Sequence, residues 1–364
     1  MNMKIVFLVN SLQNQRCIKR IKEFIAQGCD VEVYAYSRLK DSYSNFSFEV
    51  KVLGTLRNDI SYAKRFPILI KDIRSVVKRN KGQNVVYYLF GLDLAMAFRI
   101  VNRKDKYVFE ESDLVHTYMG NAMLRGLLEK IDKRIIQHSA KTVFTSEGFE
   151  EYHFGEEKPE NTVVIANKLN QDILKMEIKE KMSYDKIRVG FVGKPRFKSV
   201  VAFAKVLCER HKNFEFHVYG GPILEEKEGF EALSKFDTYF YHGPFKNPDE
   251  LPEIYSQLDL VLSTYDIEFE NVRYAEPNKL YEAIFFRIPI IVSENTFLGD
   301  KVRRLGIGYC VNPLDEKSVS DLLDAINFEA IEKRRCNCAK IDRRECVDCF
   351  DVFVKEVKSL MALH

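Results

Sequence analysis

Short apolar runs alternate with amphipathic segments along the whole chain, and this alternation limits the fold more than any other feature of the sequence. A run such as Val85–Phe90 is apolar at consecutive positions, which is typical of a strand buried on both faces of a parallel sheet. A segment such as Gln15–Ala26 has apolar residues at helical spacing. Strands that alternate with helices predict an α/β fold. The 27 Phe and 18 Tyr among 364 residues supply ample apolar surface for the cores of such a fold.

The strand pattern occurs in two halves of the chain. In the first half, we predict strands at residues 4–9, 31–36, 49–53, 85–90, 107–110, 142–145 and 162–165, with helical segments such as 15–26 and 118–138 between them. A polar segment, 168–186, has no strand character. Strands are then predicted at residues 188–192, 215–219, 239–241, 260–263 and 289–292.

These two halves predict two doubly wound Rossmann-like domains that face a central cleft. The N-terminal domain comprises residues 1–167, the linker 168–186 and the C-terminal domain 187–342. The remaining segment, 343–364, contains a predicted helix at about 344–361, which we expect to pack back on the N-terminal domain.

Several functional classes lack the sequence features that they require. The strand Lys4–Val9 runs into Asn10 rather than into a glycine-rich loop, so a dinucleotide fingerprint is missing, and the Walker pattern is missing too. The net charge of +3 excludes a broadly polybasic nucleic-acid binder. The first residues resemble a buried strand more than a signal peptide, and no apolar run reaches the roughly 18 residues of a membrane span. We therefore expect a cytoplasmic protein with reduced thiols.

The segment that begins at Pro277 is a candidate anion site. Pro277 suits the first turn of a helix, and the N–H groups of Asn278, Lys279 and Leu280 would then lie at the helix N-terminus. Such an end attracts anions, and Lys279 adds a full positive charge. Glu282 lies one turn further along, on the face of Asn278, where its carboxylate suits the hydroxyls of a ribose. The alternative is an ordinary helix with solvated charges.

A second candidate anion site follows the first strand of the second half. Gly193 allows a ligand to approach the backbone, and the cations of Lys194, Arg196 and Lys198 suit a diphosphate. The alternative is a solvated loop.

Two glycine-rich turns follow the next predicted strands, at Gly220 and Gly243. The carboxyl ends of parallel strands share one edge of a sheet, so these turns are candidates to frame a nucleobase. They are equally typical of ordinary strand-to-helix turns.

Three segments together resemble a known enzyme family. Residues 277–293, PNKLYEAIFFRIPIIVS, resemble the P-x-K-x-x-E-x-x-x-x-G-x-P signature of the family-four retaining glycosyltransferases (glycosyl transferases group 1), which have the GT-B fold. Residues 190–199, GFVGKPRFKS, resemble the diphosphate loop of that family. Residues 140–151, AKTVFTSEGFEE, followed by VVIANKLN at 163–170, resemble the end of its first domain. Before these segments, only the strand–helix rhythm is similar.

The resemblance implies transfer of a sugar from a nucleotide-diphosphate sugar to a hydroxyl group, with retention of the anomeric configuration and without a metal or other cofactor. It implies that Lys194, Arg196 or Lys198, together with Lys279, hold the leaving diphosphate, whose phosphate takes the acceptor proton. It also implies that Glu282 binds the ribose.

This chain departs from the family at two positions. The family has a glutamate eight positions before Glu282, where this chain has Tyr274, so the contact with the donor sugar is absent or comes from Glu270 or Glu276. The family glycine of the helix–strand turn is Arg287 here. These departures affect the prediction of the donor sugar more than the prediction of the nucleotide.

The first domain is expected to bind a saccharide or lipid-linked acceptor. The candidates at the end of the strand at 107–110 are Glu111, Asp113 and His116, since carboxylates and imidazoles bind sugar hydroxyls. His116 is also a candidate catalytic residue, against the alternative that it is a buried structural group. Asn10, at the end of the first strand, is a further candidate for acceptor binding.

The basic segment 57–81 has two interpretations. It contains eight Lys or Arg, and apolar residues recur at near-helical spacing, so one face is apolar and the other cationic. Such a helix suits an anionic membrane surface, which would place the protein at the inner face of the plasma membrane. Alternatively, the apolar stripe packs on the sheet. Nucleic acid is not an expected partner, because no recognition motif accompanies the segment.

Four cysteines near the C-terminus, Cys336, Cys338, Cys346 and Cys349, have the spacing of a four-thiolate zinc site. However, they lie in predicted helices, where a Cys-x-Cys pair points to different faces. We therefore predict no metal site there.

The leading functional prediction is a retaining glycosyltransferase of surface polysaccharide assembly. A nucleotide-sugar epimerase of the same fold and a non-catalytic nucleotide-sugar binder stay open as alternatives. An epimerase acts on the nucleotide-sugar without an acceptor, and a non-catalytic binder does not turn it over.

Overall fold

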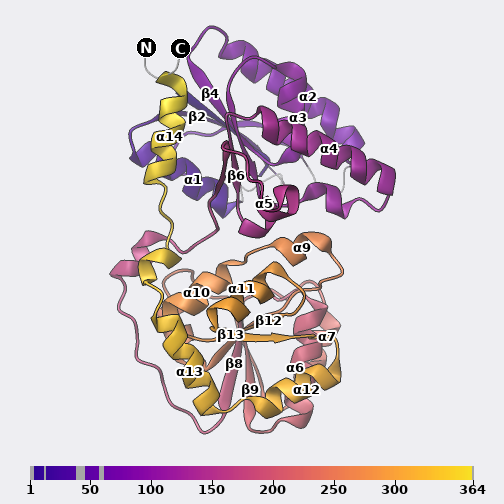
Figure 1. Ribbon diagram of the computed structural model, residues 1–364, viewed down its shortest axis with the longest axis vertical. Coiled ribbons are helices and arrows are strands. Elements are labelled where there is room, and N and C mark those ends of the chain that lie inside the picture. The colour runs from indigo at the N-terminus through magenta and orange to yellow at the C-terminus, as the bar shows by residue number, and fades with distance from the viewer. Residues whose placement is uncertain (1–3, 12–13, 38–45, 57–60, 363–364) are drawn as a thin grey trace. The chain divides into compact units, whose positions relative to one another are not determined.

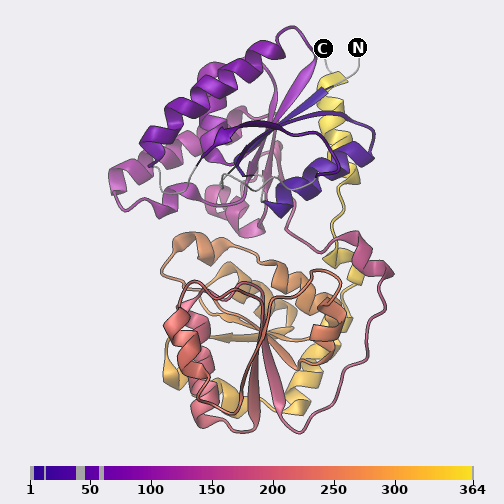
Figure 2. The ribbon, with the colours of Figure 1, turned by 180° about the vertical axis from the view of Figure 1, so that it is seen from behind.

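The computed structural model describes residues 4–11, 14–37, 46–56 and 61–362. The chain divides into two compact units, each shown from two sides in Figures 1 and 2. Unit 1 comprises the described residues up to Ala166 and those from Cys349 onward, and unit 2 comprises Asn167–Asp348. Each unit contains a parallel sheet with helices on it, which confirms the predicted α/β class.

Unit 1 is built on a sheet with the strand order β3-β2-β1-β4-β5-β6-β7. Its strands are β1 (Lys4–Val9), β2 (Asp30–Ser37), β3 (Lys51–Thr55), β4 (Val85–Phe90), β5 (Tyr107–Glu111), β6 (Lys141–Phe144) and β7 (Thr162–Val164). Its helices are α1 (Gln15–Ala26), α2 (Tyr62–Arg79), α3 (Leu92–Val101), the 3-10 helix η1 (Val115–Tyr118), α4 (Ala122–His138), α5 (Glu147–Phe154) and α14 (Asp351–Ala362).

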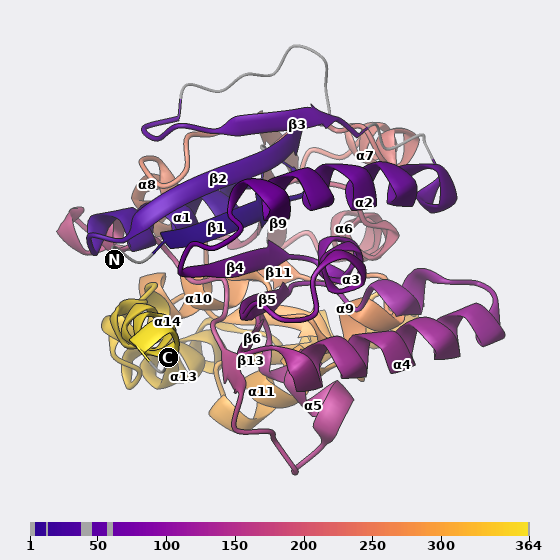
Figure 3. The same cartoon turned by 90° about the horizontal axis from the view of Figure 1, so that it is seen from above.

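Helices cover both faces of this sheet. Successive strand residues point to opposite sides, so the consecutive apolar residues of the strands need helices on both faces to bury them. On one face, Phe24 of α1 packs edge-on against Phe7 at 5.4 Å between ring centroids. Phe353 of α14 packs against Phe24 at 6.0 Å, so the C-terminal helix completes the core of unit 1. On the other face, Phe98 of α3 lies 4.7 Å from Tyr87, and Figure 3 shows α2, α3 and α4 along this side.

Unit 2 is built on a sheet with the order β10-β9-β8-β11-β12-β13. Its strands are β8 (Ile187–Val192), β9 (Phe214–Tyr219), β10 (Tyr239–Gly243), β11 (Leu260–Ser263), β12 (Ile290–Ser293) and β13 (Gly308–Val311). Its helices are η2 (Gln171–Lys175), α6 (Lys198–Arg210), α7 (Lys227–Leu233), α8 (Leu251–Ser256), α9 (Glu270–Tyr274), α10 (Asn278–Phe286), α11 (Phe297–Leu305), α12 (Glu316–Ala325), α13 (Phe328–Ala339) and η3 (Arg343–Cys346).

The core of unit 2 follows the same alternation. On β8, Val189 and Phe191 are buried in a cluster with Phe203 of α6, which also takes in residues of α7 and α12. Gly190 points to the opposite face, where a Cβ would lie 2.3 Å from the side chain of Leu258. The missing side chain therefore lets Leu258 pack directly on the strand.

The structure differs from the sequence prediction most clearly at four places. The strand β13 was not predicted, since its run of four residues is short and only alternately buried. The helix predicted at 118–138 begins at Ala122, because the Asn121 side chain caps it by accepting from Leu124 N–H. The C-terminal helix begins at Asp351, after a 3-10 turn, rather than at residue 344. Pro277 is the N-cap of α10 rather than its first helical residue.

Candidate functional site

The strand order of unit 2 reverses direction between β8 and β11. Strands β9 and β10 lie on one side of this pair, and β12 and β13 lie on the other. In open parallel sheets, ligands bind outside the carboxyl ends of the strands at such a switch point. The loops that follow here are residues 193–197 and 264–269. The first contains the predicted diphosphate loop, so the topology and the sequence indicate the same place.

The three predicted donor-site glycines lie side by side at this edge. Gly193 N–H donates to the Tyr219 carbonyl oxygen at 2.8 Å, and Gly220 N–H donates to the Gly243 carbonyl oxygen at 2.7 Å. A Cβ on Gly220 would lie 1.9 Å from the Gly193 carbonyl oxygen, and its φ is +138°. No larger residue fits there without moving the backbone, so the close contact of these turns requires glycine.

Lys279 of α10 reaches the loop after β8. A Cβ on Gly193 would lie 3.2 Å from Lys279 Nζ. The same Nζ lies 4.5 Å from the centroid of the Phe191 ring and 5.9 Å from that of Tyr265, in cation–π contact. The two anion sites predicted separately from the sequence therefore meet, with a positive charge beside Gly193.

The three cations of the loop have exposed side chains and different contacts. Lys194 forms an ion pair with Glu225 at 3.1 Å, and both side chains are about half exposed. The Arg196 guanidinium lies 4.9 Å from the centroid of the Phe197 ring. Lys198 is the first residue of α6. An exposed ion pair contributes little to stability, so Lys194 can leave Glu225 and bind another anion at small cost.

A carboxylate that the sequence analysis missed caps α6. Asp266, from the loop after β11, accepts hydrogen bonds from Ser199 N–H at 2.9 Å and Lys198 N–H at 3.3 Å. Its side chain is buried. The N-terminus of α6 is therefore already occupied by an anion of the chain itself. Asp266 lies 67 residues from Ser199 in the sequence, so no local sequence pattern predicts this cap.

The N-terminus of α10 differs from the prediction in one amide. Leu280 N–H donates to the Pro277 carbonyl oxygen at 3.1 Å, so it does not point outward as predicted. Asn278 is exposed, and Lys279 is half-buried. The charge of Lys279, more than a row of backbone amides, therefore makes this helix end attractive to an anion.

Glu282 lies one turn into α10 and is buried. One of its oxygens accepts a hydrogen bond from Tyr255 Oη of α8 at 2.7 Å. Burial raises the pKa of Glu282, while Tyr255 and Lys279 act in the opposite direction. Tyr255 was not predicted from the sequence, because it belongs to no motif. Contact with a ribose stays a prediction for Glu282, and Tyr255 is the group that orients its carboxylate.

The positions that depart from the family pattern have distinct surroundings. Tyr274 ends α9 and is half-buried. The Glu276 carboxylate is buried and accepts from Lys301 Nζ at 2.6 Å and Tyr281 Oη at 3.2 Å, so its charge is already balanced within unit 2. Arg287 has a φ of +59° and a ψ of +39°, the left-handed conformation in which glycine is usual.

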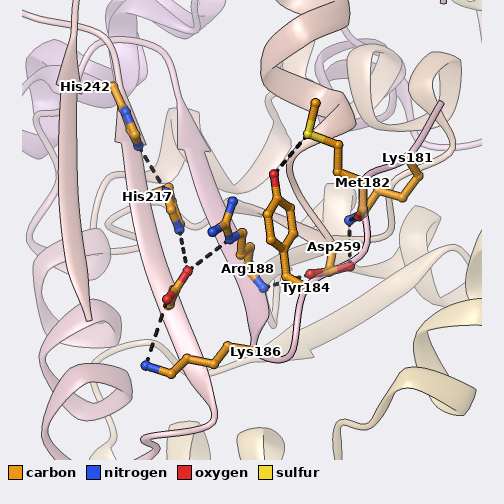
Figure 4. A network of polar contacts seen from close by, with 9 residues as sticks. Lys181, Met182, Tyr184, Lys186, Arg188, His217, His242 and Asp259 are labelled. Carbon is orange, nitrogen blue, oxygen red and sulfur yellow. Dashed lines mark hydrogen bonds and ion pairs between the residues drawn. The ribbon is translucent and has the colours of Figure 1, made fainter. Parts of the chain in front are cut away.

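A polar network leads along the sheet to the same edge (Figure 4). His242 and His217 are hydrogen-bonded at 3.0 Å between ring nitrogens, and His217 lies 3.3 Å from Glu215. The Arg188 guanidinium bonds Glu215 at 2.9 Å and stacks on the ring of Tyr184 from the predicted linker. Burial lowers the pKa of His217 to about 4. The linker thus packs on the sheet of unit 2.

Unit 1 has a switch point of its own, between β1 and β4. Asn10 follows β1, and Gly91 follows β4. A Cβ on Gly91 would lie 3.2 Å from Asn10 Nδ2 and 3.3 Å from Asp93 Oδ1. This edge therefore presents an amide and a carboxylate, which both bind hydroxyl groups. Asp93 was not among the predicted residues.

The other predicted acceptor residues lie elsewhere. Glu111 and His116 are 1% and 0% exposed, so the structure corrects the expectation that they line an acceptor site. His153 Nε2 lies 3.0 Å from Glu111 Oε2, and His116 Nδ1 lies 3.4 Å from Asp132 Oδ2. Burial raises the pKa of Glu111 to about 8 and that of Asp132 to about 7. Asp113 is exposed.

The predicted basic helix is α2, whose apolar stripe is used within unit 1. Leu69, Ile73 and Val76 are buried, so the structure supports the packing interpretation rather than a stripe that lies on lipid. Residues 57–60 of this segment lie outside the described residues. Within the described chain, no helix combines the length and the apolar composition that crossing a membrane requires.

The C-terminal cysteines are dispersed. Cys336 and Cys349 are exposed, whereas Cys338 and Cys346 are buried. Burial raises the pKa of both buried thiols to about 12, which disfavours the thiolate form that zinc requires. Among the described residues, these four do not form a group with metal-ligand spacing.

No protein-family model matches the chain. The curated succinoglycan biosynthesis protein ExoL of Rhizobium meliloti (strain 1021) is 26% identical over 173 residues, which is 44% of this chain. The match spans 42% of the length of that relative, which is less than half.

Solved structures match over nearly the whole chain. Sucrose-phosphate synthase from Thermosynechococcus elongatus superimposes with a TM-score of 0.69 at 13% identity, covering 99% of this chain and 98% of that one. Anabaena HepE in complex with UDP and glucose gives 0.67 at 12% identity, with 100% of both chains covered. A UDP-N-acetylglucosamine 2-epimerase homologue from Listeria monocytogenes gives 0.60 at 12% identity, covering 92% and 91%. These similarities establish that the chain has the fold of the GT-B glycosyltransferases.

Proposed function

We propose that this protein is a retaining glycosyltransferase that transfers a sugar from a nucleotide-diphosphate sugar to a saccharide or lipid-linked acceptor in surface polysaccharide assembly. One observation carries the proposal: the charge of Lys279 lies against Gly193 at the switch point of unit 2, beside the closely packed glycine turns. The negative charge of a nucleoside diphosphate complements the positive charge of Lys279 beside Gly193. The complexes of HepE with UDP and with UDP-glucose, and the assignment of ExoL to succinoglycan biosynthesis, support the choice of substrate class.

In the proposed reaction, the bond between the anomeric carbon and the diphosphate oxygen breaks as the acceptor oxygen bonds to that carbon on the same face. Negative charge develops on the leaving diphosphate, where Lys279 and the loop cations Lys194, Arg196 and Lys198 stabilise it. The acceptor proton passes to an oxygen of the leaving phosphate. The transfer requires no metal, because these side chains supply the positive charge.

The acceptor is proposed to bind at the edge of unit 1 that holds Asn10 and Asp93, with the exposed Asp113 as a further contact. An amide and a carboxylate form directional hydrogen bonds with sugar hydroxyls. The protein is further proposed to act in the cytoplasm, at the inner face of the plasma membrane where a lipid-linked acceptor is available. The exposed cations on the outer face of α2 would contribute electrostatic attraction to anionic lipid.

The first test is binding. Thermal shift and calorimetry with UDP, GDP, CMP and their sugars should reveal one preferred nucleotide, and Glu282→Gln should weaken it while keeping the volume of the side chain. Glu253→Gln, in an exposed pair with Lys179, is the matched control. If no nucleotide binds to the folded protein, the proposal is wrong.

The second test is turnover. Incubation of the preferred donor with candidate saccharide acceptors should yield a new glycoside, whose anomeric configuration by NMR should match that of the donor. The fold similarity to an epimerase homologue gives the main competing function. Conversion of the nucleotide-sugar to an epimer without any acceptor would indicate that function instead. Binding with neither product nor epimer would indicate a non-catalytic binder.

A further inference from the structure

Four ionisable side chains meet in the interior of unit 1, and the proposed transfer does not use them. They come from four different segments. Glu111 ends β5, His116 lies in η1, Asp132 in α4 and His153 in α5. None is more than 7% exposed, and Asp132 and His116 are fully buried. Residues of this kind are rarely fully buried unless they are paired or bind a metal.

The geometry brings three of these groups to one point. A carboxylate oxygen of Glu111, one of Asp132 and an imidazole nitrogen of His153 all lie within 4.8 Å of one another. Glu111 Oε2 and His153 Nε2 are hydrogen-bonded at 3.0 Å. Two ligands bound at about 2.1 Å to one zinc ion lie about 3.0–3.4 Å apart, so an ion can replace the proton of this hydrogen bond with little movement of the two side chains. His116 Nδ1 lies 3.4 Å from Asp132 on the border of the group.

The hydrogen bonding of the cluster is incomplete. Among the described residues, neither oxygen of Asp132 has a hydrogen-bond partner, and the same holds for Glu111 Oε1 and His153 Nδ1. Buried polar atoms without partners are unusual and call for an explanation such as an ion. Asp132 is the independent indication, because it is fully buried and one of its oxygens lies within 4.8 Å of ligand atoms of Glu111 and His153.

We propose that Glu111, Asp132 and His153 bind a divalent transition-metal cation, with Zn²⁺ as the best fit. One imidazole and two carboxylates are a mixed set that zinc accepts, and two positive charges balance the two carboxylates. His116 acts as a positioning residue, since its Nδ1 lies 3.4 Å from Asp132 Oδ2 and limits the orientations that this carboxylate can take. The ion would fasten α4 and α5 to the end of β5, so its role is structural.

The test uses the full-length chain without an affinity tag. The protein is stripped with a chelator, titrated with Zn²⁺, and assayed for metal content and thermal stability. We expect about one zinc per chain and a higher melting temperature with zinc. Asp132→Asn and His153→Gln should lose both the bound zinc and the zinc-dependent increase. The control variants Glu129→Gln and His138→Gln, which lie on α4 outside the cluster, should keep both.

The cysteines are the competing ligands, and a spectrum separates them from the cluster. Co²⁺ in place of zinc should give visible d–d bands without the near-ultraviolet thiolate charge-transfer band, and Cys336→Ser/Cys349→Ser should leave binding unchanged. The proposal is overturned if the folded wild-type chain takes up no zinc, which would leave a carboxyl pair that shares a proton. It is also overturned if Asp132→Asn retains zinc, or if the cobalt spectrum shows thiolate ligation.

Discussion

The two units share one architecture but present different chemistry at their switch points. In unit 2, the edge holds the positive charge of Lys279 beside Gly193. In unit 1, the corresponding edge holds the amide of Asn10 and the carboxylate of Asp93 beside Gly91. One edge suits an anion and the other suits neutral hydroxyl groups. The common sheet topology therefore places both candidate sites at the carboxyl ends of the strands, whereas a few side chains set the charge that each site presents.

The largest expected effect tests how strictly each edge requires its glycine. Gly220→Ala should destabilise the protein by about 4 kcal/mol, because the new Cβ would collide with the backbone oxygen of Gly193. Gly91→Ala should cost about 1–3 kcal/mol from its φ of +95°, and less than Gly220→Ala, because its Cβ would meet the ends of side chains that can move rather than backbone. Urea denaturation measures both. Equal losses would show that the glycine turns of unit 2 are no more constrained than that of unit 1.

The second prediction concerns pH and the network of unit 2. The pKa of His217 is about 4 in the folded protein and about 6.5 in the unfolded chain. Between these values only the unfolded chain binds the proton, so stability should fall as the pH drops from 6.5 to 4. The loss is up to about 3 kcal/mol, since one pKa unit corresponds to about 1.4 kcal/mol. In His217→Gln this part of the pH dependence should disappear, and an unchanged slope would contradict the assignment.

The third prediction tests the charge difference between the edges directly. Lys279→Met should weaken binding of the preferred nucleoside diphosphate by ~10- to 100-fold, the effect of one charged hydrogen bond. Lys317→Met, in an exposed pair with Asp321, should leave the affinity unchanged. Asn10→Ala should also leave it unchanged while raising the KM for the acceptor. If Asn10→Ala weakened nucleotide binding as much as Lys279→Met, the two edges would not differ as described.

The fourth prediction concerns two helix ends within unit 2. Arg287 and Gly306 both end helices in the left-handed conformation, α10 and α11 respectively. Arg287→Gly should stabilise the protein by about 0.5–1 kcal/mol by relieving this backbone conformation. Gly306→Ala should have the opposite sign, because its Cβ would also lie 2.9 Å from Asn337. Thermal denaturation of both variants provides the measurement.

Much of the sheet framework was predictable from the sequence, since continuous apolar runs mark buried parallel strands. The predicted strand bounds differ from the observed ones by at most two residues. The glycine turns could also be assigned to one edge, because the carboxyl ends of parallel strands share it, whereas only the family resemblance joined Lys279 with the loop after β8. The roles of Asp266 and Tyr255 could not be predicted, because their hydrogen-bond partners lie far away in the sequence. Glu111 was predicted as an acceptor-binding residue, since the sequence of a polar strand end does not show whether the surrounding segments bury it.

The position of α14 has a consequence for synthesis on the ribosome. Phe353 closes a core that α1 and the strands of unit 1 begin to build hundreds of residues earlier. All of unit 2, residues 167–348, is translated in between. At 5–20 residues per second this takes on the order of ten to forty seconds. During that interval the nascent chain exposes the apolar surface around Phe24, so it should be a substrate for chaperones until its last helix emerges.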